Sequence, residues 1–209
     1  MSDGACSSPT NARRKVGGVL LAAGSSSRLG EPKQLLHYDG RPLITRAAET
    51  ILSADISPLV IVIGAHAEKI RPVLDGLSVV IVENKSWAEG MGSSLRTGIA
   101  MLESIAPALD AALIALCDQP HFSRASIDAL RAALTGSRSI AATRHGESAG
   151  VPALFCRDYF PALRALTGTQ GARNLIAANP AHVACIDLPE LAIDIDTATD
   201  WARVRNNKS

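Results

Sequence analysis

The sequence predicts an α/β protein with a mostly parallel sheet, and three observations support this fold class. Short apolar runs alternate along the chain with segments of helical periodicity, as they do in α/β proteins. The run at residues 59–63 contains no polar residue, which indicates a strand buried on both faces of a parallel sheet. The apolar run at residues 19–23 leads directly into a loop of small residues, and open α/β sheets bind nucleotides at such strand ends.

The other elements follow from the same patterns. Seven strands are expected, at residues 19–23, 59–63, 79–82, 111–116, 140–143, 153–156 and 183–186. Apolar residues recur at helical spacing over residues 43–52, 95–102 and 127–134, so each of these segments is predicted to be an amphipathic helix. Ser123 precedes the third helix and can cap it. A closing helix is expected over residues 197–206.

Length and composition bound the kind of protein. At 209 residues the chain suits one domain with a substantial core. We expect residues 16–209 to form that domain and residues 1–15 to be disordered, because the chain starts with small and polar residues. A net charge of +1 and an aromatic content of 3% give no reason to expect nucleic acid or an anionic membrane as partner. No apolar run approaches the roughly 18 residues of a membrane span.

The cysteines and the N-terminal residues bear on the compartment. Cys6, Cys117, Cys156 and Cys185 are scattered and form no Cys-x-x-Cys pair, so neither a zinc site nor a disulfide framework is indicated. Basic residues at 13–15 followed by an apolar stretch imitate a signal peptide, but a first strand with its loop explains the same residues. We therefore expect a cytoplasmic protein.

The loop after the first strand carries two cations, Arg28 and Lys33, among small residues. Small residues let backbone N–H groups close around an anion, and the two cations can neutralise it. A Walker A loop does not fit, because Lys33 comes three residues after Gly30 and Gln34 follows it; the dinucleotide motif Gly-x-Gly-x-x-Gly is also missing. The alternative is an ordinary turn rich in Gly and Ser. The spacing of the two cations favours phosphate binding.

Two acidic motifs could hold a divalent cation. Asp118 follows the strand at 111–116, and Mg²⁺ is bound by carboxylate oxygens together with substrate phosphates. Alternation places Asp194 and Asp196 on the same side of a short strand, where two like charges repel unless a cation or solvent separates them. Asp196 is therefore a second candidate metal ligand. The alternatives are a turn or cap role for Asp118 and a helix cap at Asp196 or Thr197.

A third motif follows the strand at residues 79–82. Gly90, Gly92 and Ser93 introduce a helix with exposed backbone N–H groups, and such a loop can bind a base or a ribose edge. Trp87 in the same loop is more typical of a packed residue than of a stacking one. No histidine shows metal-ligand spacing, so no histidine is assigned a catalytic role.

Taken together, the motifs resemble one known family. In chain order they are Leu21-Ala22-Ala23-Gly24, Arg28-Leu29-Gly30, Lys33, Asn84, Trp87, Gly90-Met91, Ser94-Leu95, Cys117-Asp118-Gln119-Pro120, Gly150-Val151-Pro152-Ala153-Leu154-Phe155, Gly171-Ala172-Arg173 and Asp194-Ile195-Asp196-Thr197. The set resembles the molybdenum cofactor cytidylyltransferases, within the wider nucleotidyltransferase group that includes the guanylyltransferase for the same cofactor. The resemblance covers about residues 16–205. The Cys-Asp-Gln-Pro and Gly-Val-Pro-Ala-Leu-Phe motifs make it specific.

The resemblance implies a Rossmann-like three-layer α/β/α sandwich of the nucleotide-diphospho-sugar transferase type. It implies Mg²⁺-dependent transfer of CMP from CTP to the molybdopterin-type molybdenum cofactor, with release of pyrophosphate. Arg28, Lys33 and Asp118 would be catalytic, and Asp118 and Asp196 would ligate Mg²⁺. The nucleotide-binding residues it implies are Leu21, Ala22, Ala23, Gly24, Arg28, Lys33, Gly92 and Ser93.

Donor and partners follow from the same resemblance. Ala23 matches the CTP users, whereas guanylyltransferases tend to have a second glycine there.

Thr169 stands where many relatives have an acid, so the residues that bind the pterin are less well defined by the resemblance. The expected partners are CTP, a molybdopterin-type acceptor, and a molybdenum hydroxylase or its chaperone. The alternatives are GTP as donor, a sugar or polyol phosphate as acceptor, or a carrier module without catalysis.

Overall fold

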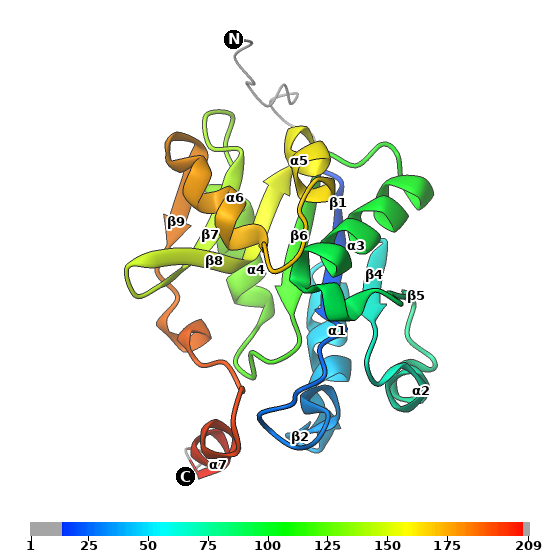
Figure 1. Ribbon diagram of the computed structural model, residues 1–209. Coiled ribbons are helices and arrows are strands. Elements are labelled where there is room, and N and C mark those ends of the chain that lie inside the picture. The colour runs from blue at the N-terminus through cyan, green and yellow to red at the C-terminus, as the bar shows by residue number, and fades with distance from the viewer. Residues whose placement is uncertain (1–13, 207–209) are drawn as a thin grey trace.

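Seven strands form one sheet in the order β5-β4-β1-β6-β8-β7-β9 (Figure 1). The computed structural model describes residues 14–206, so what was expected of residues 1–13 lies outside the described residues. The strands of the sheet are β1 (Val16–Ala22), β4 (Leu59–Ile63), β5 (Val80–Glu83), β6 (Ala111–Leu116), β7 (Ile140–His145), β8 (Ser148–Cys156) and β9 (Val183–Ile186). A small antiparallel pair, β2 (His37–Tyr38) and β3 (Arg41–Pro42), lies apart from it.

Helices cover both faces of this sheet, which confirms the three-layer prediction. The α-helices are α1 (Leu43–Ser53), α2 (Ala67–Ile70), α3 (Met91–Ile105), α4 (Arg124–Ala133), α5 (Phe160–Arg164), α6 (Ala172–Ala178) and α7 (Ala198–Asn206). The 3₁₀ segments are η1 (Lys33–Leu35), η2 (Arg71–Leu74), η3 (Trp87–Glu89), η4 (Arg157–Tyr159), η5 (Pro180–His182) and η6 (Pro189–Ala192). Figure 1 shows α3, α5 and α6 in front of the sheet and α1 and α4 behind it.

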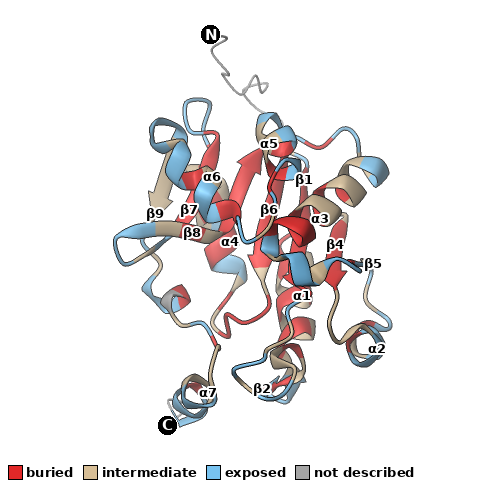
Figure 2. Cartoon of the chain, viewed as in Figure 1, coloured by how far each residue is buried: buried red, intermediate tan, exposed pale blue. Residues whose placement is uncertain are grey.

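The sheet is parallel except for one strand. β1 pairs in parallel with β4 and β6, β4 with β5, and β7 with β9, whereas β8 runs antiparallel to both of its neighbours. Residues of β1 and β4 are buried throughout, as Figure 2 shows for the centre of the sheet. Burial on both faces explains why residues 59–63 lack polar alternation.

Most predicted elements are confirmed, and the differences lie at their ends. The strands at 59–63, 111–116 and 183–186 have the predicted bounds. The first strand begins at Val16 because Gly17 and Gly18 continue the pairing with β6, although they add no apolar signal. Strand β8 begins five residues before the predicted start at 153, because Ser148–Val151 lies in the hairpin with β7.

The predicted cap at Ser123 is confirmed, and Thr197, named above as an alternative cap, also caps a helix. The Ser123 hydroxyl accepts a hydrogen bond from the backbone N–H of Ser126 at 3.3 Å and so caps α4. At the start of α7, the Asp200 carboxylate accepts from the Thr197 N–H at 2.9 Å, and the Thr197 hydroxyl accepts from the Asp200 N–H at 3.2 Å. This reciprocal pair defines where α7 begins.

The short strand predicted around Asp194 and Asp196 is wrong. Residues 193–197 belong to no sheet and form an extended connection to α7. The alternation has another cause, because Ile195 is fully buried in a separate apolar cluster with Leu36 and Val204. The backbone N–H of Ile195 donates to the carbonyl of Asp118 at 3.0 Å, which anchors the C-terminal segment beside β6. In Figure 1, α7 lies at the same end of the sheet as β2.

The order of the strands fixes where a ligand can bind. From β1 the chain builds outward through β4 to β5, then crosses through α3 to β6 on the other side of β1. Because connections leave β1 and β6 toward opposite sides, their carboxyl ends border the crevice in which open α/β sheets hold ligands. The predicted phosphate loop follows β1, and Asp118 follows β6.

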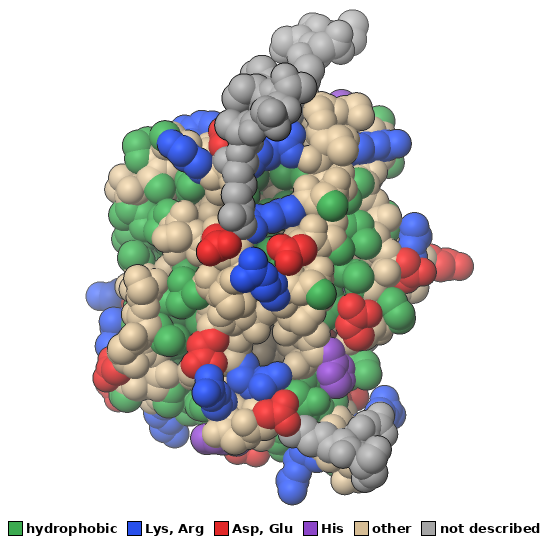
Figure 3. Space-filling model, turned by 180° about the vertical axis from the view of Figure 1, so that it is seen from behind, with side chains coloured by type: hydrophobic (Ala, Val, Ile, Leu, Met, Phe, Trp, Pro, Cys, Tyr) green, Lys and Arg blue, Asp and Glu red, His purple; other side chains and the backbone are tan. Residues whose placement is uncertain are grey.

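The surface carries no sign of an extended basic patch on the face seen in Figure 3, where Lys and Arg side chains are interspersed with Asp and Glu. Within residues 14–206, no helix is both long and apolar enough to cross a bilayer, and the longest, α3, has 15 residues. The backbone N–H of Lys15 donates to the Asp110 carboxylate at 2.7 Å. The division of the chain at residue 16 stays a prediction.

Close packing between α3 and the sheet gives a test of this fold. A Cβ atom at Gly98 would lie 2.4 Å from Val19 Cγ1 and 2.9 Å from Val62 Cγ2, so Gly98→Ala forces α3 away from β1 and β4. Overpacking of this kind costs about 1–3 kcal/mol, which exceeds the helix propensity that alanine gains, at most ~1 kcal/mol. We expect urea unfolding of Gly98→Ala to show a lower midpoint. Gly136→Ala is the matched control, because its Cβ would meet nothing within 4 Å; equal midpoints for the two variants would contradict the packing described.

Candidate active site

The loop after β1 is held in shape by Gln34, a residue that the sequence reasoning did not assign. Its side-chain amide donates to the carbonyls of Ala22 at 2.9 Å and of Gly24 at 2.8 Å, and Gln34 is almost completely buried. The Ser26 hydroxyl accepts from the Lys33 backbone N–H at 3.0 Å. These bonds join both ends of the loop, so its course is fixed by the chain itself. They also fix where the Lys33 side chain starts.

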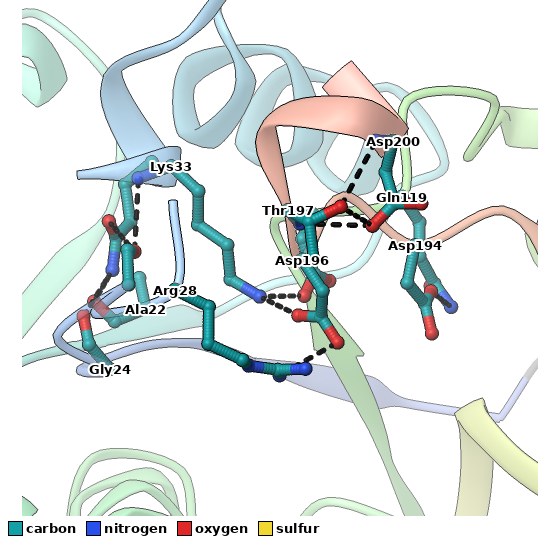
Figure 4. A network of polar contacts seen from close by, with 12 residues as sticks. Ala22, Gly24, Arg28, Lys33, Gln119, Asp194, Asp196, Thr197 and Asp200 are labelled. Carbon is teal, nitrogen blue, oxygen red and sulfur yellow. Dashed lines mark hydrogen bonds and ion pairs between the residues drawn. The ribbon is translucent and has the colours of Figure 1, made fainter. Parts of the chain in front are cut away.

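Arg28 and Lys33 both reach Asp196 in one charged cluster (Figure 4), which also includes Asp118. The Lys33 Nζ donates to Asp118 Oδ2 at 2.5 Å and to Asp196 Oδ1 at 2.9 Å, and Arg28 donates to Asp196 Oδ2 at 3.0 Å. The Lys33 and Asp118 side chains are only 18% and 8% exposed, whereas that of Arg28 is 69% exposed. All three predicted catalytic residues and both predicted metal ligands therefore meet at one place.

The cluster shifts the pKa values of its members. Burial on its own lowers the pKa of the Lys33 ammonium, but the carboxylates of Asp118 and Asp196 outweigh burial and raise that pKa. Burial on its own raises the pKa of Asp196, but hydrogen bonds and charges from Lys33 and Arg28 lower it overall. Both groups are thus held in their charged forms. Cys117 next to Asp118 is the opposite case, because burial raises the pKa of its thiol to about 12.

The two acids suit a divalent cation. Asp118 is 5% exposed, and its Oδ1 is buried without a hydrogen-bond partner among the described residues. A buried carboxylate oxygen without a donor is costly, and a hard cation bound by oxygen ligands removes that cost. Within residues 14–206, no group of three or more His, Cys, Asp or Glu side chains forms a ready-made metal site. Asp118 and Asp196 would therefore hold a cation together with ligands from outside the chain, such as phosphate.

Asp194 lies beside the cluster without joining it. Its Oδ1 accepts a hydrogen bond from the Gln119 amide at 3.1 Å, and the same amide donates to the Val151 carbonyl at 3.3 Å. Burial, and then the negative charge of Asp118, raise the pKa of Asp194. The Gln119 Oε1 is buried without a partner among the described residues. The structure thus gives the two acids of the motif different surroundings.

Two cavities meet at the charged cluster. The first cavity, about 320 Å³, is lined by the loop after β1 and by Trp87, Ser94 and Cys117. The second cavity, about 560 Å³, is lined by Arg28, Gln119, His145, Arg173, Asp194 and Asp196. Leu21, Lys33, Met91, Leu116 and Asp118 border both cavities. A ligand in either cavity can therefore reach Lys33 and Asp118.

The predicted nucleotide-binding residues fall into two groups. Leu21, Ala22, Ala23 and Gly24 line the first cavity. Gly92 and Ser93 line neither cavity: Gly92 packs against Thr167, and the Ser93 hydroxyl donates to the Gly90 carbonyl at 2.8 Å. Their neighbours Met91 and Ser94 face the first cavity instead. A role for Gly92 and Ser93 at the base or ribose stays a prediction.

The start of α3 is hydrogen-bonded to the loop before α6. Nothing in the sequence indicated this contact. The Gly92 N–H donates to the Gly168 carbonyl at 3.0 Å. A Cβ at Gly90, whose φ is +118°, would lie 2.4 Å from that same carbonyl oxygen, so only glycine allows this approach. The loops that border the first and second cavities are therefore in direct contact.

Residues 18–183 match the MobA-like NTP transferase domain family. This match, on an α/β fold with two cations and two carboxylates at one crevice, identifies an enzyme of the nucleotidyltransferase class. The chain belongs to that family, and the match covers most of the sheet and the loop carrying Arg28 and Lys33.

Curated relatives carry different names. The chain is 35% identical over 201 residues to "Nicotine blue oxidoreductase" of Paenarthrobacter nicotinovorans, covering 90% of this chain and 96% of the relative. It is 29% identical to "Purine catabolism protein PucB" of Bacillus subtilis, covering 92% and 97%. It is 30% identical over 112 residues to "Probable molybdenum cofactor guanylyltransferase" of Bacillus cytotoxicus, covering 53% and 52%. The first two are similar over nearly their whole length.

Solved structures show the same fold. The manganese complex of Rv0371c from Mycobacterium tuberculosis superposes with a TM-score of 0.72 at 28% identity, covering 91% of this chain and 97% of that one. A nucleotidyl transferase from Methanothermobacter thermautotroptrophicus gives a TM-score of 0.78 at 24% identity, covering 92% and 97%. These likenesses confirm the predicted fold class.

The raised pKa of Asp194 makes a prediction about stability. A carboxyl whose pKa is higher in the folded than in the unfolded state stabilises the fold at low pH, and that contribution is lost as pH rises through the folded pKa. Asp194→Asn removes the charge and keeps an oxygen for the Gln119 amide. We expect the variant to have a larger free energy of unfolding than the parent at pH 7. This gain should shrink as the pH is lowered toward 3.8, the ordinary pKa of an aspartate, because Asp194 of the parent then becomes protonated.

Urea unfolding of both proteins at pH 7 and pH 4 measures this difference. Asp187→Asn, at an exposed position, makes the same change of charge and serves as control. If Asp194→Asn were no more stable than the parent at pH 7, the described surroundings of Asp194 would be wrong.

Proposed function

We propose that this protein transfers CMP from CTP to the molybdopterin-type molybdenum cofactor, with Mg²⁺ and with release of pyrophosphate. One observation carries the proposal: Lys33 and Asp118 lie 2.5 Å apart at the boundary of two cavities. A transferase for two phosphorylated substrates needs such a shared wall, because donor and acceptor must meet at one phosphorus atom. The match to the MobA-like NTP transferase family supports the same reaction class.

The first cavity suits the donor. Its walls are the backbone-rich loop at Ala23 and Gly24 and the apolar side of Trp87. The loop offers close backbone approach to phosphates, and Lys33 supplies the positive charge. We assign the CTP base and ribose to the side of Trp87 and Ser94, and the triphosphate to the side of Lys33.

The second cavity suits the acceptor. Arg28 and Arg173 offer charge for its terminal phosphate, and Gln119, His145 and Asp194 offer polar atoms for the remainder. An acceptor rich in N–H groups fits that polar wall, since a carboxylate and a carboxamide oxygen accept hydrogen bonds. A molybdopterin-type acceptor combines such groups with a phosphate.

The chemistry needs charge neutralisation and alignment. An oxygen of the acceptor phosphate forms a bond to the α-phosphorus of CTP while the bond from that phosphorus to the bridging oxygen breaks, and pyrophosphate leaves with the electron pair. Both reactants are anions, so Arg28 and Lys33 lower the barrier by holding and neutralising them in line. No general base is required, because the attacking phosphate is already ionised. Asp118 and Asp196 would hold Mg²⁺, which supplies further positive charge to the phosphates when bound.

GTP is the second candidate donor. The observation in its favour is the similarity to a relative named as a guanylyltransferase, although that similarity spans about half of each chain. Ala23 favours CTP as donor, because Ala23 lines the first cavity and guanylyltransferases tend to have glycine at this position. The product would pass to a molybdenum hydroxylase or its chaperone.

The first prediction concerns turnover. Lys33→Ala and Asp118→Ala should each abolish pyrophosphate release, because each removes a charge that the reacting phosphates require. The measurement is pyrophosphate release with CTP, Mg²⁺ and the molybdopterin acceptor, alongside circular dichroism to verify the fold. Arg96→Ala, whose side chain lines neither cavity, should retain activity. Unchanged turnover in either site variant would remove that residue from the mechanism.

The second prediction concerns the donor base. Ala23→Gly should shift the ratio of kcat/KM for CTP over GTP toward GTP by about tenfold, since one methyl group in a pocket has an effect of this size. Ala112→Gly is the matched control, because it also removes a buried methyl group from the apolar cluster that contains Ala23, but Ala112 lines neither cavity. A panel of CTP, GTP, UTP and ATP with pyrophosphate detection provides both ratios. A parent enzyme that prefers GTP would overturn the assignment of CTP.

A further inference from the structure

We propose that Lys33 acts as an exchangeable cation, which either bridges Asp118 and Asp196 or turns to a bound triphosphate when a divalent cation takes the carboxylates. The consequence is that metal and triphosphate bind cooperatively and each binds weakly alone. The inference rests on the proposed function only in assuming that the site takes a divalent cation and a triphosphate. It does not depend on which base or acceptor is used.

Lys33 occupies carboxylate oxygens that a divalent cation would also need. The Lys33 Nζ lies between Asp118 Oδ2 and Asp196 Oδ1, at 2.5 Å and 2.9 Å, and Arg28 takes the other oxygen of Asp196. Mg²⁺ is bound directly by one or two carboxylate oxygens, at about 2.0–2.1 Å. The Oδ1 of Asp118 has no partner among the described residues, but both oxygens of Asp196 are taken, by Lys33 and Arg28. A metal ion that bridges the two acids therefore competes with the Lys33 ammonium for Asp196.

The charges within the cluster are balanced. Two cations, Arg28 and Lys33, face two carboxylates, Asp118 and Asp196, so the group as a whole is neutral. A metal ion that binds alone must leave the Lys33 ammonium without its partners in a largely buried place. A triphosphate that draws Lys33 away alone must leave Asp118 unpaired, at 5% exposure. Either ligand binding alone therefore opposes the ion pairs, whereas the two together give every charge a partner.

Lys33 has the reach for this exchange. Its backbone is fixed through the N–H bond to the Ser26 hydroxyl, but its four-carbon side chain has several rotatable bonds between the backbone and the ammonium. Lys33 borders the first and second cavities, so its ammonium can approach a phosphate in either one without a change of the backbone. The device requires only a rotation of one side chain.

The coupling between metal and triphosphate binding can be measured through the affinity for either ligand. If metal binding raises the affinity for triphosphate, triphosphate raises the affinity for metal by the same factor. Removing Lys33 then frees the carboxylates, so the protein should bind a metal ion more tightly in the absence of any phosphate. Removing Asp196 frees Lys33 and Arg28, so the protein should bind triphosphate more tightly in the absence of metal.

The first experiment titrates Mn²⁺ alone into Lys33→Met and the parent, and electron paramagnetic resonance measures free Mn²⁺. We expect Lys33→Met to bind Mn²⁺ about tenfold or more tightly. Arg173→Met is the matched control: it removes the same charge from the lining of the second cavity, but Arg173 contacts neither carboxylate. Equal or weaker Mn²⁺ binding by Lys33→Met, or an equal gain in the control, overturns the proposal.

The second experiment keeps the test valid if Lys33→Met fails to fold. Calorimetry measures binding of inorganic tripolyphosphate, with a chelator present, to the parent and to Asp196→Asn. We expect Asp196→Asn to bind severalfold more tightly, because Lys33 and Arg28 lose one partner carboxylate. Asp194→Asn is the control, since Asp194 lines the same cavity but contacts Gln119 rather than the two cations. An equal gain in both variants would reduce the effect to general electrostatics and overturn the exchange.

The outcome of these two experiments does not depend on whether the proposed CMP transfer is correct. Neither uses a nucleotide base, an acceptor or turnover, so a wrong donor or acceptor leaves both results intact. An active CMP transferase in which Lys33→Met leaves Mn²⁺ affinity unchanged would keep the reaction and remove the exchange.

Discussion

The contact of the Lys33 ammonium with Asp118 and Asp196 joins three segments that lie far apart in the sequence. The lysine comes from the loop after β1, Asp118 follows β6, and Asp196 precedes α7. Asp118 is almost fully buried, and loss of the partner of a buried charge costs about 3–5 kcal/mol. The site and the placement of the C-terminal segment therefore depend on the same ion pairs, so that chemistry and fold are not separable there.

Hydrogen bonds to backbone groups hold the segments that carry Lys33 and Asp196. Gln34 ties the loop after β1 to its own strand, and the N–H of Ile195 anchors the segment of Asp196 to the carbonyl of Asp118. Ile195 itself is buried, so an apolar side chain fixes the register of the two acids beside it. These anchors fix the backbone from which Lys33 and Asp196 extend, so only the side chains need to move when a ligand binds.

The two cavities draw on different parts of the chain. Strand ends and the loop after β1 form most of the first cavity, whereas the second draws on residues 145–196 from β7, β8, α6 and the C-terminal connection. Under the proposed function, the first part would bind the phosphates of the donor and the second part the acceptor. Substitutions in the second part could then change the acceptor without disturbing the sheet, because function lies in the site rather than in the fold.

The sequence by itself determined the α/β class, most strand positions and the cap at Ser123, because these follow from local patterns. It also singled out Arg28, Lys33 and Asp118 as candidate site residues. Only the tertiary structure decided how those residues meet. The order of strands brings β1 and β6 together, and burial of Ile195, not strand pairing, places Asp196 against Lys33. Gln34 and the contact between Gly92 and Gly168 left no local signal, since their hydrogen bonds run between segments whose proximity depends on the completed fold.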